Sequence, residues 1–167
     1  MSPLEPSENK IKELISLFDK KKFDQLLKLS NELIDEFPNS ILIQNIQGVV
    51  HTELKNYKLA KNLFIKVVNL SPNYTDGHYN LANVYNKLDE KEKAIESYNK
   101  VIELDINYFK AHNNLGNIYR KKGFNKRAIE CYLSTLEINS NYKVAYYNLA
   151  GVLQFYMLDV EYKNINK

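Results

Sequence analysis

The chain has 167 residues, of which 44% are hydrophobic and 26% charged, a balance that can bury a core and excludes a disordered chain. Five Gly and four Pro are too few for a turn-rich β-sandwich, and the single cysteine, Cys131, excludes an internal disulfide framework or a multi-cysteine metal site. The net charge of +3 is far from the strong field of a dedicated nucleic-acid binder, which argues against nucleic acid as a partner.

The N-terminal part is predicted to be a short extension, residues 1–6, followed by a degenerate capping repeat, residues 7–40. Its first helix is indicated by an apolar stripe at Ile11, Leu14, Ile15 and Phe18, and a second helix follows over residues 23–37. The first ten residues contain no apolar run that would mark a secretory signal, and no run reaches the ~20 residues of a membrane helix. We therefore expect a cytoplasmic protein with no membrane partner.

Internal repetition dominates the rest of the chain. Three segments align without gaps at offsets of 34 residues, and they begin at Gly77, Ala111 and Ala145. A second block repeats in the same register as Ala60-Phe64, Ala94-Tyr98 and Ala128-Tyr132. The repetition divides the chain into predicted units at residues 41–74, 75–108 and 109–142, with an incomplete unit at residues 143–167.

Each unit is predicted to be a pair of helices. In the unit at 75–108, Leu81, Val84, Tyr85 and Leu88 form one helical stripe, and a second stripe starts at Ala94 after a polar turn. Such a pair cannot bury both of its apolar faces alone, so neighbouring pairs are expected to stack. The fold class is therefore expected to be all-α.

These motifs resemble the tetratricopeptide repeat family. The resemblance covers roughly residues 7–156 and is carried by three blocks: Leu81/Ala82/Tyr85/Ala94/Tyr98, Leu115/Gly116/Tyr119/Ala128/Tyr132 and Gln47/Gly48/His51/Ala60/Phe64/Pro72. The bulky Trp position of the family holds His78, His112 and Tyr146, and the closing Pro is replaced by Ile106 and Ser140. The resemblance implies a right-handed α–α superhelix of helix-turn-helix repeats.

One position is always small: it holds Gly48, Ala82, Gly116 and Ala150. Glycine in mid-helix costs ~1 kcal/mol relative to alanine, so its recurrence predicts a place where paired helices touch. At the C-terminal end, Leu153, Tyr156 and Leu158 lack a polar cap, and Tyr162 occupies a position that is otherwise small. This end indicates a truncated array and predicts self-association.

Catalytic and metal sites are not favoured by the sequence. His78 and His112 are one repeat apart, roughly 8–10 Å in packed helices, whereas zinc needs nitrogens ~2.1 Å away. Cys131 has no nearby histidine or second cysteine and is expected to be inert. The chain has no phosphate-binding loop, nucleophile elbow or paired-carboxylate motif. We therefore expect a protein that is not an enzyme and has no cofactor or metal.

Asparagines recur on the first helix of the repeats, which in this family lines a concave groove. Asn80, Asn114 and Asn148 share one position, and Asn83 and Asn117 share another. The pattern resembles the asparagine ladder of O-linked N-acetylglucosamine transferases, which implies a grip on an extended peptide backbone. The general abundance of asparagine in this chain is the competing explanation. The flanking residues of the expected groove are Tyr79, Lys87, Lys110, Asn113, Arg120, Lys121 and Phe155.

The resemblance implies a non-catalytic scaffold or adaptor that binds protein or an extended peptide, with the cations favouring an acidic partner. A clamp for a C-terminal carboxylate, found in other members, is doubtful because Tyr79 and Asn113 stand where a lysine is needed. The alternative is an N-terminal, substrate-recruiting repeat segment of a larger glycosyltransferase or sulfotransferase. Recognition of RNA by a helical repeat is a third option, weakened by the low net charge.

Overall fold

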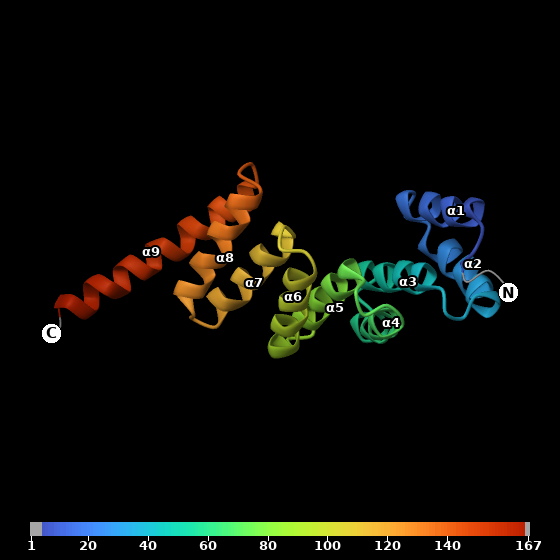
Figure 1. The fold of residues 1–167 in the computed structure, drawn as a ribbon, viewed down its shortest axis with the longest axis horizontal. Coiled ribbons are helices and arrows are strands. Elements are labelled where there is room, and N and C mark those ends of the chain that lie inside the picture. Colours follow the sequence, from blue (N-terminus) through green and yellow to red (C-terminus); the bar gives the residue numbers. More distant parts are fainter. Residues whose placement is uncertain (1–4, 166–167) are drawn as a thin grey trace. The chain divides into compact units, whose positions relative to one another are not determined.

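The structure is a computed structural model that describes the backbone of residues 5–165 and the side chains of residues 5–156. Within these residues every regular element is an α-helix, which confirms the all-α fold class. The helices are α1 (Glu8–Asp19), α2 (Phe23–Glu36), α3 (Ile41–Glu53), α4 (Tyr57–Leu70), α5 (Thr75–Lys87), α6 (Lys91–Leu104), α7 (Phe109–Lys121), α8 (Asn125–Ile138) and α9 (Lys143–Ile165) (Figure 1).

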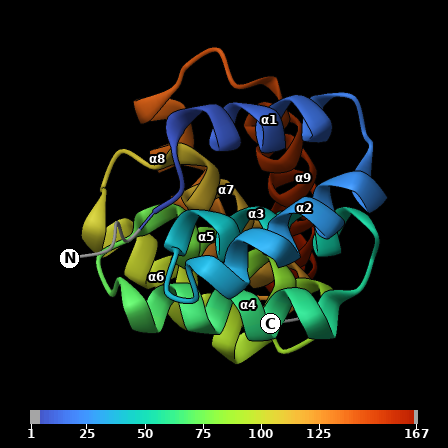
Figure 2. The ribbon, with the colours of Figure 1, turned by 90° about the vertical axis from the view of Figure 1, so that its right-hand side faces the viewer.

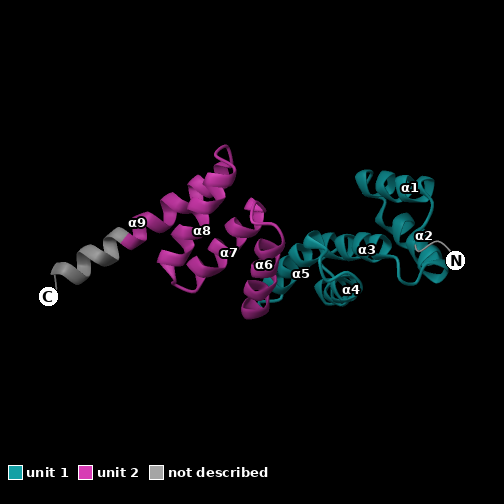
Figure 3. Ribbon diagram, in the orientation of Figure 1, with its two compact units in different colours: residues 1–89 teal, residues 90–167 magenta. Residues whose placement is uncertain are grey.

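The chain forms two compact units, residues 1–89 and residues 90–167 (Figure 3). The boundary lies between α5 and α6, inside the repeat predicted for residues 75–108. Unit 1 therefore contains α1 to α5, and unit 2 contains α6 to α9.

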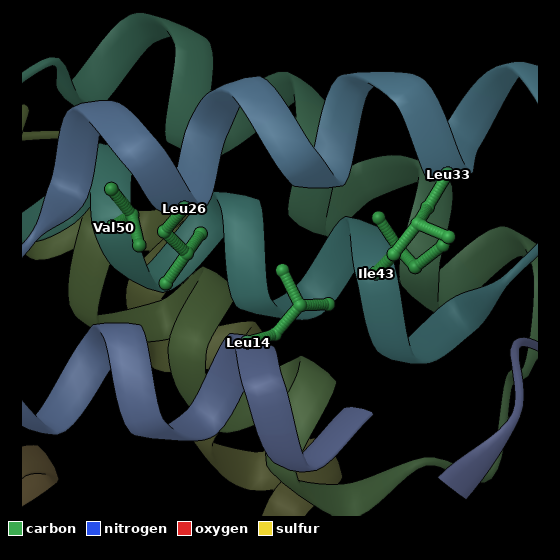
Figure 4. Packing of buried hydrophobic residues seen from close by; sticks show 5 residues of the cluster. All are labelled: Leu14, Leu26, Leu33, Ile43 and Val50. Atoms are coloured by element: carbon green, nitrogen blue, oxygen red, sulfur yellow. The ribbon is translucent and has the colours of Figure 1, made fainter. Parts of the chain in front are cut away.

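In unit 1, α2 packs on both α1 and α3, and α4 packs on both α3 and α5 (Figures 1 and 2). The core between the first three helices consists of Leu14, Leu26, Leu33, Ile43 and Val50, which lie between 0% and 6% exposed (Figure 4). These residues come from three different helices, and no pair of neighbouring helices in the sequence could bury all of them. The stacking expected from the stripes is thus present in this unit.

In unit 2, α7 packs on α6 and α8, and α8 packs on α9. Ala128, Tyr132 and Val152 form a buried cluster with Tyr119, Ile129 and Leu149 packed against it. Tyr132 is fully buried, so this aromatic residue of the repeat motif is part of the core. The first half of α9, from Lys143 to about Val152, therefore closes one side of this core.

The turn between the two helices of each pair contains one residue with a left-handed backbone. These residues are Lys21 (φ 54°), Lys55 (φ 61°), Asp89 (φ 63°) and Gly123 (φ 77°), and they recur every 34 positions. Such a residue ends a helix by directing the next backbone N–H back to the helix, as Asn56 N–H does to the carbonyl of His51 at 2.8 Å. Only Gly123 adopts this conformation without a steric penalty.

The small-residue position lies where the two helices of a pair touch. A Cβ added at Gly48 would lie 2.6 Å from Phe64 Cε1, and one added at Gly116 would lie 2.7 Å from Tyr132 Cε1. Ala82 occupies the same position on α5 and is fully buried. Ala150 on α9 is exposed, because α9 continues as one helix to Ile165 instead of turning back within the described chain.

His78 and His112 each hold the turn that precedes their helix. His78 Nε2 lies 2.8 Å from the carbonyl oxygen of Pro72, and His112 Nε2 lies 3.0 Å from that of Ile106. In both repeats the carbonyl belongs to the residue six positions before the histidine. This shared contact explains why histidine can replace the bulky residue expected at this position. The predicted extension also makes a contact of this kind, because the Glu5 carboxylate accepts hydrogen bonds from the Ser40 hydroxyl and from Ile41 N–H.

Candidate peptide-binding site

The asparagines singled out from the sequence lie on the first helices of their pairs, in both units. Asn80 and Asn83 lie on α5 in unit 1, whereas Asn114, Asn117 and Asn148 lie on α7 and α9 in unit 2. All five side chains are partly buried rather than fully solvated. Their surroundings are therefore described within each unit.

In unit 1, Asn80 is tied to the preceding first helix. Its Nδ2 donates to Oδ1 of Asn45 on α3 at 3.0 Å, and Asn45 Nδ2 lies 3.5 Å from the Tyr74 hydroxyl. Asn45 precedes Asn80 by 35 residues, whereas the repeats are 34 residues long. It therefore lies one residue before the position equivalent to Asn80, which is Ile46, and was not singled out from the sequence. The amide plane of Asn80 is thereby oriented by a neighbouring repeat.

In unit 2, a chain of amides links α9 to α7. Asn148 Nδ2 donates to Asn113 Oδ1 at 3.0 Å, Asn113 Nδ2 donates to Asn114 Oδ1 at 3.3 Å, and Asn114 Nδ2 donates to the Tyr98 hydroxyl at 3.3 Å. Asn113 is only 2% exposed, so it positions its neighbours and does not itself face solvent. The 35-residue separation of Asn113 and Asn148 repeats that of Asn45 and Asn80.

Asn117 has a different contact. The Tyr132 hydroxyl donates to Asn117 Oδ1 at 2.8 Å, which satisfies the polar end of a fully buried ring. Burial raises the pKa of Tyr132 to about 12, even though the charge of Arg120 acts in the opposite direction. Asn117 is therefore bound to the core of unit 2 through one of its two amide ends.

The predicted flanking cations are exposed. Lys87 lies in the last turn of α5, Lys110 in the first turn of α7, and Arg120 and Lys121 in the last turn of α7. Tyr79 is partly buried on α5, next to Asn80 in the sequence. Phe155 on α9 is 69% exposed. Each unit thus presents lysine or arginine on the same helices that carry the asparagines.

An apolar depression in unit 1 was not predicted from the sequence. It has a volume of about 150 Å³ and lies between α1 and α3, where its lining residues are Leu14, Ile15, Phe18, Asn45, Ile46 and Val49. Asn45 thus contributes both to this depression and to the hydrogen bond with Asn80. A single apolar side chain would fill a volume of this size.

No group of three or more potential metal ligands occurs among the described residues, and none of their helices is long and apolar enough to cross a bilayer. Burial, aided by the charge of Glu130, raises the pKa of the Cys131 thiol to about 11. The thiolate, which is the reactive form, is therefore scarce at neutral pH, as expected for an inert cysteine.

Three family models described as tetratricopeptide repeat match the chain, at residues 43–74, 75–108 and 97–130. Together they span residues 43–130, which is more than half of the 167 residues. A comparison with curated proteins gives no significant match.

Several solved structures share the fold. A crystal structure of MamA is 24% identical with a TM-score of 0.80 and covers 86% of this chain and 84% of its own. MamA from Desulfovibrio magneticus RS-1 is 25% identical with a TM-score of 0.74, covering 81% and 76%. YrrB, described as a TPR protein with an unusual peptide-binding site, is 19% identical with a TM-score of 0.75, covering 91% and 78%. The first TPR of Spaghetti (RPAP3), bound to the HSP90 peptide SRMEEVD, is 21% identical with a TM-score of 0.68, covering 70% and 93%.

Proposed function

Because the chain belongs to the tetratricopeptide repeat family, we propose that it is a non-catalytic scaffold or adaptor that binds an extended peptide or protein segment. The observation that carries the proposal is the paired amides on the first helices, Asn45 with Asn80 and Asn113 with Asn148. Each pair orients an asparagine through a neighbouring repeat. Orientation before binding lowers the entropy lost when a ligand is bound.

We propose that the oriented amides bind the backbone of the peptide. An asparagine amide contains an acceptor and two donors, and only one donor of Asn80 and of Asn148 is used in the pairs described above. Each amide can thus pair with a backbone C=O and N–H, as in the asparagine ladder of the O-linked N-acetylglucosamine transferases. Contacts of this kind address the backbone and predict loose sequence preference.

We further propose that the preferred partner is acidic. Lys87 and Lys110 are exposed on helices that carry the asparagines, and both attract carboxylates. Two of the similar structures have descriptions that refer to peptide binding, and the peptide bound to one of them, SRMEEVD, contains three acidic residues. The apolar depression beside Asn45 would accept one apolar side chain of such a peptide.

The proposal is tested with the combined Asn80→Ala, Asn114→Ala and Asn148→Ala variant and peptides selected from a random library on the parent protein. Affinity for these peptides should fall sharply, because each lost hydrogen bond is worth ~0.5–1.5 kcal/mol. Circular dichroism checks the fold, since the same amides also hydrogen-bond within the protein. Unchanged affinity in a folded variant would refute the asparagine ladder.

A second variant keeps the test informative if the triple variant unfolds. Lys87→Ala with Lys110→Ala changes two exposed side chains, so folding should be preserved and affinity for acidic peptides reduced. Equal binding of acidic and neutral peptides by the parent would refute the acidic preference. The function as a peptide-binding module is tested on the parent protein alone: if no peptide is selected from the library, that function is refuted.

Self-association and cytoplasmic residence also belong to the proposal. Leu153 and Phe155 are 40% and 69% exposed on α9 and offer an apolar surface to a second copy. The side chain of Leu158, which was expected to extend this surface, lies outside the described residues, as does that of Tyr162. Cell fractionation with an antibody against the full chain tests the cytoplasmic location.

A further inference from the structure

The low net charge of the chain conceals a strongly basic region. Residues 106–156 contain seven Lys and Arg but only two Asp and Glu, a net charge of +5, whereas residues 1–105 contain 14 cations and 16 carboxylates, a net charge of −2. No carboxylate occurs between Asp105 and Glu130. The excess positive charge of the whole protein therefore lies on α7, α8 and the first half of α9 in unit 2.

Most of these cations gather at one turn. Five of the eight residues from Arg120 to Arg127 are cations, and they surround the turn between α7 and α8. Lys122 is paired with Glu92, and the Arg127 guanidinium lies 5.6 Å from the centre of the Tyr119 ring and 5.8 Å from that of Phe124.

The remaining three cations are exposed. Among the described residues, no carboxylate forms an ion pair with Arg120, Lys121 or Lys126. The carboxylate of Glu130 lies one turn further along α8 and is also exposed. The turn thus presents unpaired positive charge to solvent, which is the condition for attracting an anionic partner.

The same turn is hollowed and partly apolar. One depression of about 420 Å³ is lined by Arg120, Lys121, Asn125, Val152 and Phe155. A second, of about 390 Å³, extends from Gly123 to Arg127 and reaches Tyr156 on α9, so that Asn125 lines both. The helices α7, α8 and α9 that build them all belong to unit 2 (Figure 3).

The first turn of α8 contains cations and no carboxylate. The N-terminal end of a helix favours anions, yet the first turn of α8 contains Lys126 and Arg127 and no acidic residue. Its N-cap residue, Phe124, provides no side-chain hydrogen bond and is 48% exposed. Lys126 and Arg127 are therefore unfavourable at this helix end, and for Arg127 the contacts with the rings of Tyr119 and Phe124 offset this.

We infer that the surface formed by Arg120, Lys121, Asn125, Lys126 and Phe155 binds an acidic peptide segment that contains an apolar or aromatic side chain. The carboxylates would lie against the three exposed cations, and the apolar side chain would cover the exposed ring of Phe155 at the edge of the depression. Charge complementarity decides the occupant, since a neutral or basic segment would leave these cations without counterions. The inference rests on the peptide-binding function proposed above and gives it a further contact surface, which includes the flanking residues Arg120, Lys121 and Phe155 and none of the asparagines of the ladder.

The test uses a fluorescein-labelled peptide in which acidic residues surround one phenylalanine, measured by fluorescence anisotropy with the full chain. The Lys121→Gln, Lys126→Gln variant should bind about tenfold more weakly, because two exposed charge contacts are lost. Lys58→Gln with Lys66→Gln is the matched control, since it removes two exposed lysines from α4 in unit 1 and should bind like the parent. Phe155→Ser, which changes a 69% exposed ring, should also weaken binding while leaving the helical content unchanged.

Three results would overturn the inference. The first is that the lysine variant binds the peptide as tightly as the control variant does. The second is that the parent binds a peptide with Gln and Asn in place of the acidic residues as tightly as the acidic peptide. The third is that a uridine oligonucleotide binds the parent more tightly than the peptide and is alone able to displace it, which would indicate a nucleic-acid site. The triple asparagine variant separates the two proposals. If the asparagine ladder fails and this surface is correct, that variant binds the probe like the parent while the lysine variant still loses affinity.

Discussion

Replacing Gly116 by leucine tests the helix contact on which the repeat depends. A Cβ at this position would lie 2.7 Å from Cε1 and 3.0 Å from Cδ1 of Tyr132, and 3.1 Å from Cβ of Cys131, whereas ordinary contacts are 3.4 to 4 Å. Tyr132 cannot move aside easily, because it is fully buried and its hydroxyl is bound to Asn117. The added side chain must therefore displace α8 or force the ring from its place.

The magnitude follows from two opposing effects. Removing a glycine from mid-helix gains ~1 kcal/mol in helix propensity, and overpacking a buried contact costs ~1–3 kcal/mol for a small addition and more for a whole leucine side chain. Gly116→Ala should therefore lower the free energy of unfolding by only ~0–2 kcal/mol, whereas Gly116→Leu should lower it by about 3 kcal/mol. Urea unfolding followed by circular dichroism measures both.

Gly151 on α9 provides the matched control. A Cβ there would meet only Arg120 Nη1, at 3.6 Å, so Gly151→Leu should leave stability unchanged or raise it by up to ~1 kcal/mol. Truncation of the opposing ring, Tyr132→Ala, should make the cost of Gly116→Leu smaller in the double variant than in the parent background. If Gly116→Leu unfolds at the same urea concentration as the parent, the predicted contact between α7 and α8 is wrong.

Three further predictions concern the turns, the thiol and the C-terminal helix. Lys55→Gly should raise the free energy of unfolding by up to ~1 kcal/mol, since φ is 61° there and glycine adopts it without strain; thermal unfolding measures this, and a destabilised variant would contradict it. Iodoacetamide should modify Cys131 at pH 8 roughly 100-fold more slowly than an exposed thiol, because burial raises the pKa of the thiol from 9.0 to about 11. Burial favours the protonated thiol, so its contribution to stability should be full below pH 9.0 and lost as the pH rises through about 11. Unfolding of the parent and of Cys131→Ala across this pH range would detect the loss. Self-association at high concentration, measured by light scattering, should be relieved by Tyr156→Glu with Leu158→Glu, and a strict monomer before any mutation would count against it.

The sequence predicts the fold well because each core residue repeats in register. Gly48 and Gly116 lie two repeats apart at the same position, and each would place a Cβ against an aromatic ring of its own repeat. A contact inside one repeat is visible as a pattern, since both partners recur together. The helices and the small-residue position follow directly from this.

The candidate site is predicted only in part, because its contacts cross between repeats. Asn80 and Asn148 were found by their shared position, but their partners Asn45 and Asn113 lie one residue out of register, at a separation of 35. Asn113 was expected only as a flanking residue of the groove, whereas it is 2% exposed and orients Asn148 and Asn114. The basic turn was hidden for another reason, since total charge averages the acidic first part of the chain with the basic region that follows.

The contact between the small position and the aromatic ring restricts the order in which this protein can change over evolution. At Gly48 and Gly116 the ring already fills the space of a Cβ, so an alanine there costs ~0–2 kcal/mol unless the ring shifts or is replaced by a smaller side chain. The reverse change, from alanine to glycine, creates no clash but loses ~1 kcal/mol of helix propensity. The glycine and the ring therefore constrain each other within a repeat, and a new repeat that arose by duplication of residues 109–142 would inherit this constraint as the pair Gly116 and Tyr132.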